Sequence, residues 1–70
     1  MAKTVTAKFA SLDAARNAHE DLIDLGYPDE TVFLNRESGD VKVMTSDEGE
    51  KEAREVLDRH RPTEITARDS

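Results

Sequence analysis

The chain has 70 residues, of which 36% are hydrophobic and 37% charged, and its formal net charge is −6. A chain of this length forms one domain with a small core, so we expect a single domain over residues 1–70 with an ordered core at about 4–68. Cysteine is absent, which excludes disulfides and thiolate metal sites. The excess of acidic side chains repels phosphate backbones and anionic membranes.

The hydrophobic pattern of the first third changes from a strand period to a helix period. Residues 4–10 alternate between apolar and polar side chains, which is typical of a half-buried strand. A helix is expected to begin at Leu12, with the Ser11 hydroxyl as its N-cap. Gly26 suits the left-handed position that ends a helix. The sequence therefore predicts a strand followed by an amphipathic helix.

The middle of the chain predicts a hairpin and then a second helix. Residues 31–36 are rich in β-branched and aromatic residues, residues 41–45 alternate between apolar and polar side chains, and polar turn residues separate the two runs. We expect Ser46 or Asp47 to cap the second helix. Asp47 and Glu50 also have the spacing of a capping box, in which the Glu50 carboxylate accepts from the N–H of the cap.

The last elements complete two matching strand-helix-strand halves. Pro62 ends the second helix, residues 64–68 alternate as a short last strand, and we expect residues 69–70 to fray. This order predicts an α+β, ferredoxin-like βαββαβ fold. Its four-stranded, antiparallel-type sheet has the order 4-1-3-2, with both helices on one face. We expect the first and third strands to lie together in the centre and run parallel.

Candidate catalytic groups are few. His19 and His60 are the residue type most often used for acid–base catalysis and metal binding, but neither has a carboxylate or second histidine at metal-binding spacing on its own helix face. We interpret both as half-buried structural histidines. Ser11 and Ser46 are explained as helix caps rather than nucleophiles. The sequence therefore predicts no enzyme activity, no metal and no cofactor.

The sequence also gives an expectation for location. No run approaches the ~18 apolar residues of a membrane span, and the N-terminus lacks the pattern of a signal peptide. We therefore expect a cytoplasmic protein without a membrane partner.

The uncovered face of the predicted sheet is the candidate binding surface. By strand alternation, its residues are expected to be Thr6, Lys8, Phe33, Lys42 and Met44. In the alternative register of the second strand, Val32 and Leu34 face out in place of Phe33. The two central strands present no aromatic side chain for base stacking, so we expect no nucleic-acid partner. A small mixed patch suits a second copy of the chain, as a homodimer, or another protein. An edge strand is the alternative contact between copies, because the second and fourth strands leave unpaired backbone groups that can extend a sheet.

The first half of the chain carries a family resemblance. Phe9-Ala10-Ser11 leads into a helix with Ala15 and Ala18 on its apolar face, the helix stops at Leu25-Gly26-Tyr27, and an aliphatic strand follows at residues 32–34. This pattern resembles the opening of the bacterial general-stress or heat-induced stress protein domain. The resemblance implies a stress-related cytoplasmic protein with a ferredoxin-like fold and without known catalytic residues.

Two other families share the predicted topology. The pattern Val5-x-Ala7-x-Phe9-Ala10-Ser11, with Val41-x-Val43, is similar to the SPOR domain, a module that binds septal peptidoglycan. Lys8, however, stands where that family has a glycine. The ligand-binding ACT domain has a glycine between its first strand and helix, where this chain has Ala10-Ser11. We therefore expect a non-enzymatic interaction or self-association module, with peptidoglycan binding and ACT-type ligand binding as alternatives.

Overall fold

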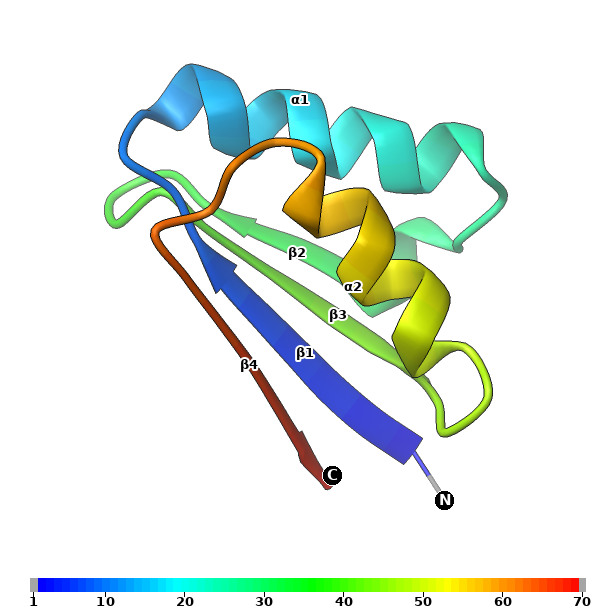
Figure 1. Ribbon diagram of the computed structural model, residues 1–70. Coiled ribbons are helices and arrows are strands. Elements are labelled where there is room, and N and C mark those ends of the chain that lie inside the picture. The colour runs from blue at the N-terminus through cyan, green and yellow to red at the C-terminus, as the bar shows by residue number, and fades with distance from the viewer. Residues whose placement is uncertain (1, 70) are drawn as a thin grey trace.

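The computed structural model describes residues 2–69, which form one sheet and two helices. The element order is β1 (Ala2–Lys8), α1 (Leu12–Asp24), a 3-10 turn η1 (Asp29–Thr31), β2 (Val32–Asn35), β3 (Asp40–Ser46), α2 (Glu50–Asp58) and β4 (Glu64–Asp69). Both helices lie on the same side of the sheet (Figure 1). The predicted α+β, ferredoxin-like βαββαβ fold is therefore confirmed.

The strand order is β2-β3-β1-β4, which is the predicted order counted from the other edge. Every neighbouring pair is antiparallel, including the central pair β1 and β3, where Val5 lies opposite Val43. The prediction that these two strands run parallel was wrong. The hairpin turns β3 against β2, and the crossover through α1 makes β2 run in the same direction as β1. β3 lies between β1 and β2 and must therefore run antiparallel to both.

The ends of α1 agree with the prediction. The Ser11 hydroxyl oxygen accepts a hydrogen bond from the Ala14 N–H at 3.2 Å. After the helix, Gly26 has φ +108°, and its N–H donates to the Ile23 carbonyl, while the Tyr27 N–H donates to the Leu22 carbonyl. These bonds form a Schellman motif, which satisfies carbonyls that the helix end leaves free.

The start of α2 differs from the prediction. The helix begins at Glu50 with Gly49 as its N-cap, and glycine has no side chain with which to cap. The Ser46 hydroxyl instead accepts from the Gly49 N–H at 3.1 Å and closes the turn before the helix. A capping box from Asp47 to Glu50 is therefore wrong, because this turn moves the helix start beyond Asp47. A β-carbon at position 49 would overlap the Thr45 hydroxyl, so a larger residue requires the Thr45 side chain to move.

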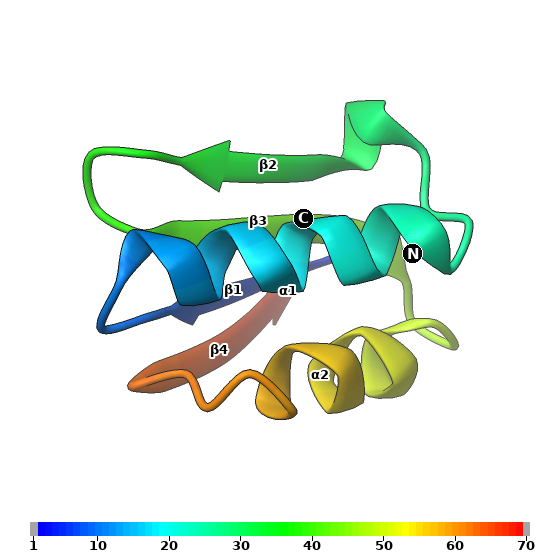
Figure 2. The same cartoon turned by 90° about the horizontal axis from the view of Figure 1, so that it is seen from above.

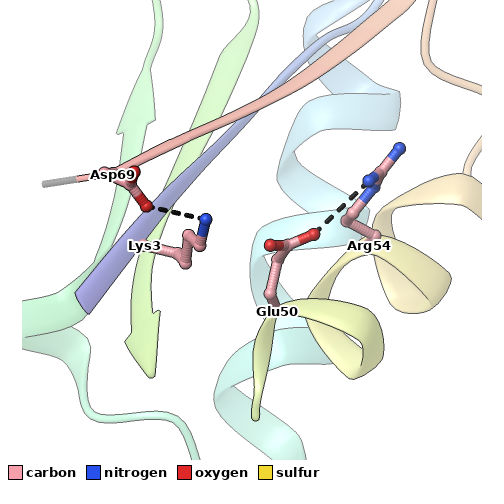
Figure 3. Close-up of polar contacts among 4 residues, drawn as sticks. All are labelled: Lys3, Glu50, Arg54 and Asp69. Atoms are coloured by element: carbon pink, nitrogen blue, oxygen red, sulfur yellow. Dashed lines mark hydrogen bonds and ion pairs between the residues drawn. The ribbon is translucent and has the colours of Figure 1, made fainter. Parts of the chain in front are cut away.

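The outer strand β4 is longer than predicted. Asp69 does not fray but belongs to β4, and its carboxylate Oδ1 lies 2.7 Å from the Lys3 ammonium (Figure 3). Ser70 lies outside the described residues. At the other end of the pair, β1 covers Ala2–Lys8 rather than residues 4–10, so Phe9 follows the strand but remains buried.

The core lies between the sheet and the two helices. α1 packs against β2 and β3, and α2 packs against β1, β3 and β4 (Figure 2). The buried apolar residues are Val5, Ala7, Phe9, Ala15, Ala18, Leu22, Val32, Val41, Val43, Ala53, Val56 and Leu57. Within residues 2–69, neither helix is long and apolar enough to cross a membrane.

Candidate functional site

The sheet face opposite the helices carries all five residues that the sequence analysis placed there. Directly paired residues of antiparallel strands point to the same face, so the pairing defines rows across the sheet. The middle row is Phe33, Lys42, Thr6 and Thr66, and the rows on either side are Asn35, Asp40, Lys8 and Glu64, and Met44, Thr4 and Arg68. We call these eleven residues the open face.

The orientation of β2 is settled by burial. Val32 is buried, Leu34 packs against the core, and Phe33 is 47% exposed. Phe33 therefore faces outward, and the alternative register, with Val32 and Leu34 outside, is wrong. Met44, on the neighbouring strand, is 41% exposed and lies diagonal to Phe33. Two large apolar side chains thus share one face that neither helix covers, within the part of the chain that the structure describes.

Charge is distributed unevenly between the open face and the rest of the surface. Three of the ten basic side chains (Lys8, Lys42 and Arg68) and two of the sixteen acidic ones (Asp40 and Glu64) belong to the open face. The remaining surface holds fourteen acidic and seven basic side chains. The open face is thus slightly cationic in a strongly acidic protein, which the scattered order of charges in the sequence conceals.

A shallow hollow of about 710 Å³ borders the open face at the β2–β3 hairpin. It is lined by Phe33, Leu34, Asn35, Arg36, Glu37, Asp40 and Lys42. Asn35 shapes the turn, because its side-chain oxygen accepts from the N–H groups of Glu37 and Ser38. Strand alternation places Phe33 and Lys42 on a common face but does not predict this hollow, because the turn residues Arg36 and Glu37 complete its lining.

Both histidines are half-buried, as predicted. His60 has a partner that local spacing does not reveal, because its Nε2 lies 2.8 Å from the Asp21 carboxylate Oδ2, on the other helix. A carboxylate only accepts, so the imidazole must donate from Nε2. Among residues 2–69, no group of three or more His, Asp or Glu side chains is arranged to hold a metal ion.

Two side chains near the N-terminus of α2, Tyr27 and Lys3, have raised pKa values. The Tyr27 hydroxyl lies 3.3 Å from the Glu52 carboxylate and 3.5 Å from the Gly49 carbonyl. Partial burial, followed by the charge of Glu52, raises the pKa of Tyr27. Nearby, the hydrogen bond from Lys3 to Asp69 raises the pKa of the Lys3 ammonium, with smaller contributions from Asp47 and Glu50. Lys3 and the Glu50–Arg54 ion pair lie at this same end of the molecule (Figure 3).

No family model, curated protein or solved structure matches this chain. The resemblances to the stress protein, SPOR and ACT domains, and the cytoplasmic location, therefore stay predictions.

Proposed function

We propose that this protein is a non-enzymatic self-association module in which the open face of one copy packs against the open face of a second copy. The observation that carries this proposal is the exposure of Phe33 and Met44 on a face that neither helix covers. Removing apolar area from water is the main driving force of association. Thr4 lies opposite Met44 and Thr6 lies diagonal to it, so both threonines add methyl groups beside Met44.

The charge distribution favours a second copy as the occupant of this face. Two molecules that each carry a net charge of −6 repel one another. This repulsion is greatest between the acidic surfaces around the helices and smallest between two open faces, where acidic and basic groups nearly balance. The open face also contains both partners of intermolecular ion pairs, because it offers Lys8, Lys42 and Arg68 together with Asp40 and Glu64.

The test is sedimentation equilibrium over a wide concentration range, with the double variant Phe33→Asp/Met44→Asp. We expect the wild-type protein to exceed the monomer mass of 7.8 kDa and the variant to have a lower average mass at each concentration. Two desolvated carboxylates would oppose burial of the face. A wild-type monomer at all concentrations, or an unchanged mass for the variant, would contradict the proposal.

A matched control separates the face from a general effect of charge. Leu12 and Leu25 are 38% and 54% exposed and belong to α1 and its C-cap, outside the open face. The double variant Leu12→Asp/Leu25→Asp adds the same negative charge at comparable exposure. We expect this control to associate like the wild type, and circular dichroism of both variants shows whether they remain folded.

A further inference from the structure

The outer edge of β4 is a second surface with unpaired backbone groups. β4 lies at the border of the sheet, and its only neighbour among the described strands is β1 (Figure 1). The Phe9 N–H donates to the Gly39 carbonyl at 3.1 Å, in register with the β1–β3 pairs. The backbone N–H and C=O groups of successive residues in a strand point to opposite sides, so the odd-numbered residues of β1 bond to β3 and the even-numbered ones bond to β4. Their partners on β4 are also even-numbered. The N–H and C=O groups of Ile65 and Ala67 therefore point to the free edge.

The side chains of β4 leave the core incomplete at the same edge. Ile65 and Ala67 point to the helix side but are only half-buried, whereas their neighbours on β1, Val5 and Ala7, are fully buried. Ile65 lines a hollow between α2 and β4 whose other lining residues are charged side chains of α2. A further strand beside β4 would cover the exposed apolar surface of Ile65 and Ala67.

We propose that β4 pairs antiparallel with β4 of a second copy, with Thr66 opposite Thr66, and so extends the four-stranded sheet to eight strands. This register places Glu64 opposite Arg68 of the second copy, and Arg68 opposite its Glu64. On the helix side it places Ile65 opposite Ala67. The edge is therefore self-complementary in charge on one face and in apolar contact on the other.

The alternation of the strand and its charges select this register. A shift by one residue would place a residue of the helix side opposite a residue of the open face. This pairing is excluded, because a two-fold axis perpendicular to the sheet keeps each side chain on its own face and directly opposite residues share a face. A shift by two residues in either direction places Thr66 opposite Glu64 or opposite Arg68 and removes both ion pairs. The edge contact goes beyond the proposed packing of open faces, because it is made by the backbone edge of β4 with Ile65 and Ala67 and does not require the faces to pack. Glu64, Thr66 and Arg68 belong to both surfaces.

The test uses the Phe33→Asp/Met44→Asp background, in which the face contact is disrupted. We expect this protein to sediment as a dimer of the 7.8 kDa chain. Adding either Glu64→Arg or Arg68→Glu places like charges opposite each other, and we expect each to raise the dimer dissociation constant at least about tenfold. Combining the two substitutions restores the opposite pairs and should return the constant to within about threefold of the background.

The charge exchange distinguishes the edge contact from alternatives. The two single substitutions change the net charge in opposite directions, so a general charge effect would weaken one and strengthen the other. Glu20→Arg, on the exposed side of α1, repeats the charge change of Glu64→Arg away from the edge and should leave dissociation unchanged.

The outcomes for the two proposed contacts are separate. A monomeric background protein, or single substitutions without effect, would overturn the edge proposal and leave the face proposal standing. The face proposal would be overturned, and the edge contact supported, if Phe33→Asp/Met44→Asp left the mass unchanged while Glu64→Arg and Arg68→Glu each weakened the dimer and together restored it.

Discussion

His60 and Asp21 are 39 residues apart in the chain, yet the imidazole Nε2 lies 2.8 Å from the carboxylate Oδ2. Asp21 belongs to the last turns of α1, and His60 follows the end of α2. The contact therefore joins the two helices on the side away from the sheet's open face. Since His60 is 22% exposed and Asp21 45% exposed, the pair is partly shielded from water.

The first prediction concerns the energy of this pair. We expect a double-mutant cycle with His60→Ala and Asp21→Ala to give a coupling free energy of about 0.5–1 kcal/mol, because partly exposed hydrogen-bonded pairs contribute amounts of this size. Urea denaturation of the wild type, both single variants and the double variant measures it. Asp24→Ala, at an exposed position of the same helix, should show no coupling with His60→Ala. Additive single effects at Asp21 and His60 would disprove the coupling.

The second prediction compares two leucines near the end of α1. Leu22 is fully buried and Leu25 is 54% exposed, so the same truncation to alanine creates a cavity only at position 22. We expect Leu22→Ala to lower the free energy of unfolding by about 2–5 kcal/mol and Leu25→Ala by less than about 1 kcal/mol. Urea denaturation midpoints check both values. Equal losses would show that α1 does not pack as described.

The third prediction concerns the turn after α1. Gly26 has φ +108°, a backbone conformation that side chains with a β-carbon rarely adopt, and a β-carbon there would meet no atom within 4 Å. Gly26→Ala is therefore unfavourable because of the backbone conformation and not because of crowding. We expect it to lower the free energy of unfolding by about 1–2 kcal/mol. Thermal or urea unfolding measures it. A neutral or stabilising substitution would contradict the left-handed conformation at this position.

The fourth prediction is a loss of stability at alkaline pH. Burial and Glu52 raise the pKa of Tyr27 above its ordinary 10.0, and Asp69 raises that of Lys3 above 10.5. The folded state thus holds both protons more tightly than the unfolded state. This stabilisation is complete below the unfolded pKa values and is lost as pH rises through the folded ones.

Urea denaturation between about pH 8 and about pH 11.5 measures this loss. The Tyr27→Phe variant lacks the phenol, and Lys3→Met lacks the ammonium, so each should show a shallower decline of unfolding free energy above about pH 10 than the wild type. A wild-type unfolding free energy that stays constant over this range would contradict the assigned shifts. So would variants whose unfolding free energy declines as steeply as that of the wild type.

Local residue patterns predicted the parts of the fold that depend on neighbours in sequence. Ser11 caps α1 and Gly26 ends it, because both act on backbone groups within a few residues. The capping box at Asp47 and Glu50 was wrong because a competing local bond, from the Gly49 N–H to the Ser46 hydroxyl, closes a turn first. The pairing of Lys3 with Asp69 was missed, since two distant strands must align before these side chains meet.

The candidate site shows the same division. Alternation along β1 and β3 was sufficient to place Thr6, Lys8, Lys42 and Met44 on one face. It left two registers open for Phe33, because β2 has apolar side chains on both faces and only packing against α1 decides which side is buried.

The sequence by itself determined the order of helices and strands, the α+β fold and, outside β2, the apolar faces that form the core, because hydrophobic periodicity is a local property of the chain. The tertiary structure decided the antiparallel central pair, the outward position of Phe33, the gathering of basic side chains on the open face, and the free edge at Ile65 and Ala67. Each of these depends on which segments lie side by side, since charges and unpaired backbone groups are distributed by strand pairing and not by distance along the chain.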